Sequence, residues 1–173
     1  MQQGSGIHAV DRICHGTDNG NRIASSCSRM NLLSSGMEDL SKEFEIDPTR
    51  PGTDLTWAHV RIILSAKAHG LIPFGLVESL ANFADTDGLR QVVAASRQFG
   101  YGGASCIHPA QVPILNEGFA PSSEEVAKAK AVIAAYEEAE KTGVVPVFLD
   151  GRMIDVPVVE RAKQLLRRAS REH

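Results

Sequence analysis

Asp39 and Asp155 are two acids that stand where a carboxylate could do chemistry. Asp39 follows a short apolar run, in Gly36-Met37-Glu38-Asp39-Leu40. A carboxylate at the end of a strand is a suitable ligand for a hard divalent cation, which binds oxygen atoms. The spacing also fits a cap at the start of a short helix, because such an aspartate accepts backbone hydrogen bonds. From the residues alone, both interpretations stay open.

Asp155 precedes Val156-Pro157 and follows the turn Asp150-Gly151. Its carboxylate could accept and return a proton as a general base and acid. Proline is favoured in the first turn of a helix, so Asp155 is equally well placed to cap a helix. The residue therefore has a catalytic and a structural interpretation that do not exclude each other.

His108 could also act as a base, since imidazole titrates near neutral pH. A His-Pro step after a buried strand nevertheless also fits a histidine bonded to backbone. Cys14, Cys27 and Cys106 are odd in number and contain no C-x-x-C pair, which argues against a disulfide framework and a structural zinc site.

The elements that must position these residues follow from hydrophobic patterning. From Arg29 onward, short apolar runs alternate with helical periods, which predicts an α/β fold with parallel strands. The predicted strands lie at 31–35, 71–77 and 104–107. Ser122 and Glu125 predict a capping box, and Asp150-Gly151 predicts a type I′ hairpin before a last amphipathic helix. Residues 1–28 are rich in Gly, Asn and Ser and are predicted to be an unrelated or disordered tail.

Three segments together resemble the carboxy-terminal part of a known family: Gly36–Leu40, Gly102–Val112 and Leu149–Pro157. The family is that of the citrate lyase beta subunit and CoA-ester lyases, the HpcH/HpaI aldolase group. The resemblance implies the carboxy-terminal part of a TIM (β/α)8 barrel, with about three βα units and a hairpin-helix tail. Three strands are too few to close a barrel of eight. The expected division is a tail at 1–28, a partial barrel at 29–143 and a hairpin-helix lid at 144–173.

The resemblance also implies roles. Asp39 matches a Mg²⁺ ligand, and Asp155 matches an acid/base carried on a tail that covers the active site of a neighbouring subunit. His108 and Gln111 match a segment near the bound CoA arm. The implied reaction is Mg²⁺-dependent cleavage of a 3-hydroxyacyl-CoA thioester, of the malyl-, citramalyl- or citryl-CoA type, to a 2-oxo acid and an acyl-CoA. The implied assembly is a homo-oligomer or an association with a homologue.

The sequence departs from the family pattern at several positions. The family has a second, glutamate ligand on the preceding strand, whereas the matching stretch here is Val10–His15, in which Asp11 is the nearest acid. Arg152 replaces a lysine, and a family arginine that holds the substrate has no counterpart. An alternative function therefore stays open, that of a truncated, catalytically silent homologue or a partner-dependent fragment.

Composition limits the kinds of partner and the cellular location that we expect. The chain is 43% hydrophobic, enough for a packed core, and its formal net charge of −3 gives no broad basic field. We therefore expect no nucleic-acid partner and no membrane partner. No apolar run reaches the roughly 20 residues that cross a bilayer, so the expected location is the cytoplasm.

Overall fold

The computed structural model describes residues 7–11, 14–46, 55–78, 84–143 and 146–170. Its contacts divide the chain into two compact units, Met1–Phe119 and Ala120–His173. We call them unit 1 and unit 2. Within the described ranges, no helix is both long and apolar enough to span a membrane.

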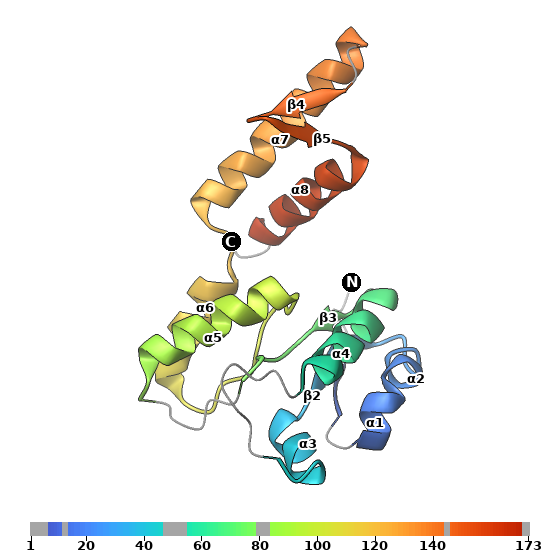
Figure 1. Ribbon diagram of the computed structural model, residues 1–173, viewed down its shortest axis with the longest axis vertical. Helices are drawn as coiled ribbons and strands as arrows, with labels where there is room; N and C mark the ends of the chain where they lie inside the picture. Colours follow the sequence, from blue (N-terminus) through green and yellow to red (C-terminus); the bar gives the residue numbers. More distant parts are fainter. Residues whose placement is uncertain (1–6, 12–13, 47–54, 79–83, 144–145, 171–173) are drawn as a thin grey trace. The chain divides into compact units, whose positions relative to one another are not determined.

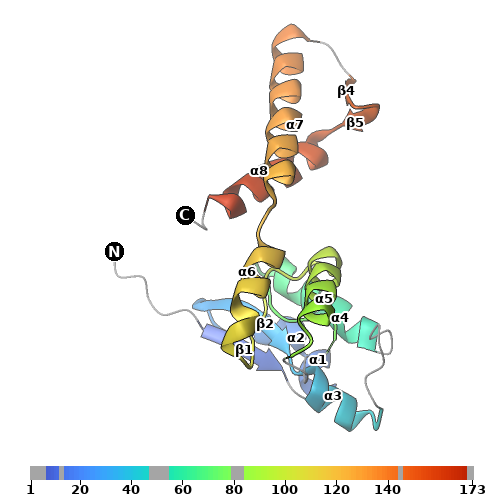
Figure 2. The same cartoon turned by 90° about the vertical axis from the view of Figure 1, so that its left-hand side faces the viewer.

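Unit 1 alternates strands with helices (Figures 1 and 2). Its elements, in chain order, are β1 (Ile7–Asp11), α1 (Cys14–Asp18), α2 (Gly20–Ala24), β2 (Met30–Ser35), α3 (Met37–Glu43), α4 (Thr56–Ala68), β3 (Ile72–Pro73), α5 (Thr86–Phe99), the 3₁₀ turn η2 (Pro109–Gln111) and α6 (Val112–Phe119).

The three strands form one parallel sheet in the order β1-β2-β3. Backbone bonds extend it beyond β3, because Gly102 N–H donates to Pro73 O at 2.9 Å and Gly75 N–H donates to Gly103 O at 2.8 Å. The segment 101–104 thus continues the sheet in the parallel sense, although the predicted strand at 104–107 is not formed. The predicted parallel α/β fold is confirmed.

The prediction that residues 1–28 form a loop or disordered tail is wrong for most of the described part. β1 pairs with β2 along its whole length, and α2 packs on the same core as β2. Gly16 lies within α1 and Gly20 within α2, whereas Asn19, Ser25 and Ser26 lie in short connections between the elements. The backbone pairing of β1 with β2 outweighs their weak local propensity.

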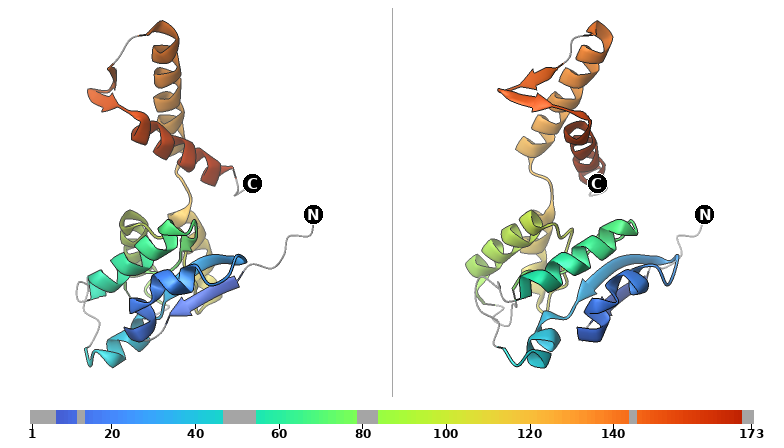
Figure 3. Two further views of the ribbon diagram at one scale, coloured as in Figure 1. Left: turned by 90° about the vertical axis from the view of Figure 1, so that its right-hand side faces the viewer. Right: turned by 45° about the vertical axis from the view of Figure 1, so that its right-hand side comes forward.

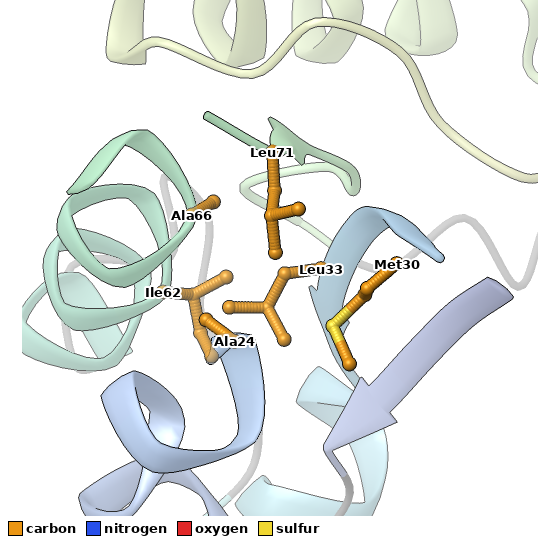
Figure 4. Packing of buried hydrophobic residues seen from close by; sticks show 6 residues of the cluster. All are labelled: Ala24, Met30, Leu33, Ile62, Ala66 and Leu71. Atoms are coloured by element: carbon orange, nitrogen blue, oxygen red, sulfur yellow. The ribbon is translucent and has the colours of Figure 1, made fainter. Parts of the chain in front are cut away.

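Helices α2 and α4 cover the sheet through an apolar cluster centred on Leu33 of β2 (Figure 4). Leu33 and Ile62 are fully buried, and Ala24, Ala66 and Leu71 complete the contact. Alanines at two of these positions let the helices approach the sheet closely. A second cluster joins α5, α6 and the segment 101–104, and its buried members are Leu89, Val93, Tyr101, Ile114, Leu115 and Phe119.

Unit 2 is a helical hairpin closed by a small antiparallel sheet (Figure 3). It contains α7 (Ser123–Thr142), β4 (Val147–Leu149), β5 (Arg152–Ile154) and α8 (Val156–Ala169). Asp150 and Gly151 both have positive φ, 50° and 73°, as the predicted type I′ turn requires. The predicted capping box is also formed, with Glu125 N–H donating to Ser122 Oγ and Ser122 N–H donating to Glu125 Oε2.

The sequence predicted that the barrel part ends at residue 143 and the lid begins at residue 144. In the structure, α7 already belongs to unit 2. Ala129 and Val132 of α7 pack against Val159 and Ala162 of α8. These contacts are non-local, so the patterning of α7 alone gave no sign of the helix it packs against. The structural boundary therefore lies between Phe119 and Ala120.

A buried polar network ties α4 to the second half of unit 1. His59 is 2% exposed, and its Nδ1 lies 2.7 Å from Tyr101 Oη. The ring also bonds to the backbone of Val77, whose N–H donates to Ser96 Oγ at 2.9 Å. Burial lowers the pKa of His59 to about 4, although the Val77 bond acts in the opposite direction. Burial also raises the pKa of Tyr101.

The lowered pKa makes unit 1 sensitive to acid. Between pH 6.5 and about 4 the unfolded His59 binds a proton that the folded one does not, so stability falls as the pH drops through this window. The loss should reach about 3 kcal/mol at pH 4. Trp57, the single tryptophan, lies on α4 and reports unfolding by fluorescence in urea.

The control for this prediction is a pair of substitutions, His59→Gln and His69→Gln. His59→Gln should lower stability at pH 7 but remove most of the loss between pH 6.5 and 4. His69 is exposed, so His69→Gln should keep the wild-type pH dependence. The same pH dependence in all three proteins would contradict the assignment to His59.

Candidate functional site

The carboxyl ends of the parallel strands bring several polar residues to one edge of the sheet. β1 ends at Asp11, whose backbone is in register with Ser35 at the end of β2. Asp39 follows β2, and Glu78 follows β3. His108 follows the segment that extends the sheet beyond β3. In parallel α/β folds this edge is where ligands bind, because the loops that leave it converge.

Asp39 is the third residue of α3 and its side chain is exposed. The helix is anchored by Leu40, which is fully buried, and by Ser41, whose Oγ donates to Met37 O at 2.8 Å. A carboxylate in the first turn of a helix interacts favourably with the helix dipole. Asp39 is thus held on a packed helix that begins two residues after β2. The N-cap of α3 is Gly36, so the predicted role of Asp39 as the helix cap is wrong. Its role as a cation ligand stays a prediction.

Gln111 does not line an open pocket. It is 1% exposed, and its Oε1 accepts from the N–H groups of Ile107 and His108. His108 itself is exposed. The structure therefore separates two residues that the sequence grouped together: His108 is accessible at the edge of the sheet, whereas Gln111 supports the turn beneath it.

Asp155 lies in unit 2, away in sequence from the other candidates, and is the N-cap of α8. Its Oδ1 accepts from Val158 N–H at 3.1 Å, and Pro157 occupies the first turn. The predicted structural role is therefore formed. The side chain is also exposed, so the second carboxylate oxygen is accessible from solvent.

The donor chemistry of the edge fits Mg²⁺. This ion commonly takes one or two carboxylates from a protein and completes its octahedron with water and substrate oxygens. Asp39 has one carboxylate that could bind the ion, and Asp11 stands at the end of the adjacent strand. The described residues contain no group of three or more His, Cys, Asp or Glu that could hold a metal, so a cage made wholly of side chains is absent from that part of the chain.

The structure places Asp11 at the end of a strand, where the sequence predicted a loop. Ile7-His8-Ala9-Val10 is a short apolar run ending in an acid, which is a weak strand signal. The glycines and asparagines around it suggested a loop instead. Only the pairing of β1 with β2 shows that Asp11 ends a strand of the sheet.

Comparisons with known proteins agree with this architecture. Residues 14–109 match the family model of HpcH/HpaI aldolase/citrate lyase. The citrate lyase subunit beta of Haemophilus influenzae is 36% identical over 154 residues, which are 89% of this chain and 52% of that protein. The (3S)-malyl-CoA thioesterase of Cereibacter sphaeroides is 38% identical over 146 residues, 82% of this chain and 49% of that protein. The chain spans about half the length of these curated relatives.

Solved structures show the same fold. The protein CitE from Mycobacterium tuberculosis, in complex with magnesium, acetoacetate and coenzyme A, superposes with a TM-score of 0.75 at 24% identity, covering 94% of this chain and 60% of that one. A citrate lyase from Burkholderia xenovorans LB400 gives a TM-score of 0.80 at 20% identity, covering 99% and 55%. The expected fold class, the carboxy-terminal part of a TIM barrel with a hairpin-helix tail, is confirmed. With more than half of its residues in the matched family model, the chain belongs to the HpcH/HpaI aldolase/citrate lyase family.

Proposed function

We propose that this chain contributes the metal ligand and the acid/base of a carbon–carbon lyase that acts on CoA thioesters. The reaction would cleave a 3-hydroxyacyl-CoA to a 2-oxo acid and an acyl-CoA. The observation that carries the proposal is the position of Asp39. It lies on α3, the helix that follows β2 at the carboxyl edge of the sheet, within the segment that matches the family model. The relatives named citrate lyase, malyl-CoA thioesterase and malyl-CoA lyase support the substrate class.

Asp39 would hold a divalent cation at this edge, with Asp11 as the second carboxylate. The register that sets Asp11 beside Ser35 supports this pair, because Asp11 ends β1 and Asp39 lies four residues after the end of the neighbouring strand, β2. Mg²⁺ bound there would polarise the oxygen that becomes a carbonyl as the carbon–carbon bond breaks. The crystal structure of CitE with magnesium supports this choice of ion.

Asp155 would act as the acid/base. The reaction requires removal of the hydroxyl proton while the bond between the second and third carbons breaks, and delivery of a proton to the carbon of the acyl-CoA product. An exposed carboxylate fixed by one hydrogen bond to Val158 can do both. As the resemblance to the family implies, we propose that Asp155 serves the edge of a second copy or of a homologue.

An exposed apolar face supports such an assembly. Ile72 of β3 is 42% exposed and pairs in register with Leu32 of β2. In a complete parallel barrel this inward face is filled by side chains from other strands. A further chain that covers it would bury apolar surface and the remaining strand edge.

Calorimetric titration of Mg²⁺ in the presence of oxaloacetate tests the metal site. Wild-type protein should bind the ion saturably, and Asp39→Ala should abolish binding because it removes the principal ligand. Asp11→Ala should weaken Mg²⁺ binding about tenfold or more. Loss of a residue that only hydrogen-bonds to a metal ligand typically weakens metal binding by at least about this much, and Asp11 is proposed as a direct ligand.

Glu38→Ala is the matched control, because Glu38 is an exposed acid next to Asp39 on the same helix turn. It should leave the affinity within about twofold. Absent Mg²⁺ binding by wild-type protein whose folding has been verified, or equal loss in the Asp39 and Glu38 variants, would overturn the site.

Substitutions at Asp155 separate its two roles. Asn caps a helix as well as Asp does, so Asp155→Asn should keep the melting temperature and lose turnover of a malyl- or citramalyl-CoA substrate by about 100-fold or more. Asp155→Ala should lose turnover and also about 0.5–2 kcal/mol of stability in unit 2. Mixing Asp39→Ala with Asp155→Asn protein should restore part of the activity if the two acids meet between copies. Full turnover by Asp155→Asn would exclude the acid/base role.

A further inference from the structure

An open apolar groove lies between the two helices of unit 2, α7 and α8 (Figure 2). Its lining includes Ala129, Val132 and Ala162, which are buried, and Val158 and Leu165, which are partly buried. We call it the α7–α8 groove. Its volume is about 190 Å³. An apolar cavity of about 150 Å³ can hold benzene, so the groove is large enough for one phenyl ring.

Two basic side chains stand at the rim of the α7–α8 groove. Lys128 of α7 and Arg161 of α8 are exposed, and neither side chain forms an ion pair or hydrogen bond with another described residue. The acid in the lining, Glu125, accepts from Ser122 N–H in the capping box. Helix α8 as a whole has four basic residues and one acid. The groove therefore suits an apolar anchor that stands beside negative charge.

Unit 1 presents such an anchor at the end of α3. Phe44, the C-cap of α3, is 40% exposed although it is large and apolar. Its ring contacts Trp57 of α4 edge to face, with the ring centroids 5.7 Å apart. This contact fixes the direction of the Phe44 ring, so little freedom would be lost on binding. Glu45 follows directly and is exposed, and residues 37–45 contain four acids and one lysine.

The backbone of Glu45 has a conformation that its residue type does not favour. Its φ is 56°, in the left-handed region, and Ile46 N–H donates to Ser41 O at 3.0 Å. Glycine or asparagine is the usual residue at this position of a helix-ending turn, because a larger side chain is strained there. A glutamate in this place supports a use for its charge outside the turn.

We propose that the α7–α8 groove of one copy of this chain binds Phe44 of a second copy, with Lys128 and Arg161 beside Glu45. The inference rests on the proposed function, because it names the contact through which Asp155 would reach the edge of the other copy. It goes beyond that function because none of the first four residues has a role in it.

The spacing along the two helices fits this contact. Phe44 lies five residues after Asp39, which is about 7.5 Å along a helix, and Arg161 lies six residues after Asp155, which is about 9 Å. When α8 lies beside α3 of the other copy in the same direction, Asp155 is therefore next to Asp39 while the groove covers Phe44. The basic α8 then also faces the acidic α3.

Photo-crosslinking of the full chain tests which surfaces meet. 4-Benzoyl-phenylalanine replaces Phe44 in unlabelled protein, which is mixed with an equal amount of ¹⁵N-labelled wild-type protein. Mass spectrometry should show position 44 of the unlabelled chain joined to residues 128–132 or 158–165 of the labelled chain. Cross-links confined to the unlabelled chain itself, cross-links to other surfaces only, or no cross-link would overturn the proposal.

Sedimentation velocity of the full chain measures the strength of self-association. Phe44→Ala should weaken it about 30-fold, as expected for an aromatic anchor at the centre of an interface. Arg161→Glu should weaken it about tenfold, because it places like charges together, and adding Glu45→Arg to that variant should restore most of the loss. Restoration by Glu45→Arg is not expected if Arg161→Glu acts only by disturbing unit 2.

The controls are Phe148→Ala and Lys130→Glu. Both side chains are exposed, and neither lines the α7–α8 groove. Each variant should keep the association constant within about twofold. A loss in Phe148→Ala as large as that in Phe44→Ala, or in Lys130→Glu as large as that in Arg161→Glu, would contradict the assigned contact.

Glu45→Asn separates docking from folding. Asparagine adopts the left-handed conformation more readily than glutamate, so the variant should keep or raise the melting temperature of unit 1. Its self-association should nevertheless weaken about threefold or more and depend less on salt concentration, because a charge at the interface is lost. Unchanged association, or weaker association together with a lower melting temperature, would overturn the role of the charge.

The two proposals fail separately. Absent lyase turnover with the expected cross-link would remove the reaction and leave the docking of Phe44 in the groove. Normal turnover without a cross-link to α7 or α8 would remove the docking contact and leave the reaction.

Discussion

Parallel pairing of β1 with β2 and of β2 with β3 is the constraint on which the rest of unit 1 depends. Parallel strands cannot be joined by tight turns, so each connection must cross over and contains a helix. The helices α2 and α4 therefore pack on the same face of the sheet, the face that carries the Leu33 side chain. The same direction of all strands sends every carboxyl end to one edge. The position of Asp11, Asp39 and His108 along that edge is a consequence of the pairing.

The buried network of His59, Tyr101, Val77 and Ser96 connects this sheet to the second core of unit 1. It joins α4, the segment after β3, α5 and the segment 101–104, which are separated by up to 42 residues. Polar groups in a core are costly unless bonded, and here the side chains meet one another or the backbone. The network therefore favours one arrangement of these elements over others that apolar packing alone would allow.

Buried supporting residues and exposed polar residues occupy different layers at the edge of the sheet. Leu40 and Gln111 are buried and support short turns, whereas Asp39 and His108, carried on those turns, are exposed. In unit 2, Asp155 both caps α8 through one carboxylate oxygen and remains exposed. Such an arrangement lets the exposed groups keep a fixed direction without becoming inaccessible to a ligand.

Local chemistry was readable from the sequence alone. The Ser122–Glu125 capping box, the Asp150-Gly151 turn and the Asp155 cap each depend on residues a few positions apart, and all are formed. The family and the fold class were also accessible, because the segments around Asp39, His108 and Asp155 are distinctive. The tertiary structure alone decided that β1 joins the sheet, that α7 packs on α8 and that Gln111 is buried. These features depend on contacts between residues that are distant in sequence. A local sequence pattern does not report the energies of such contacts.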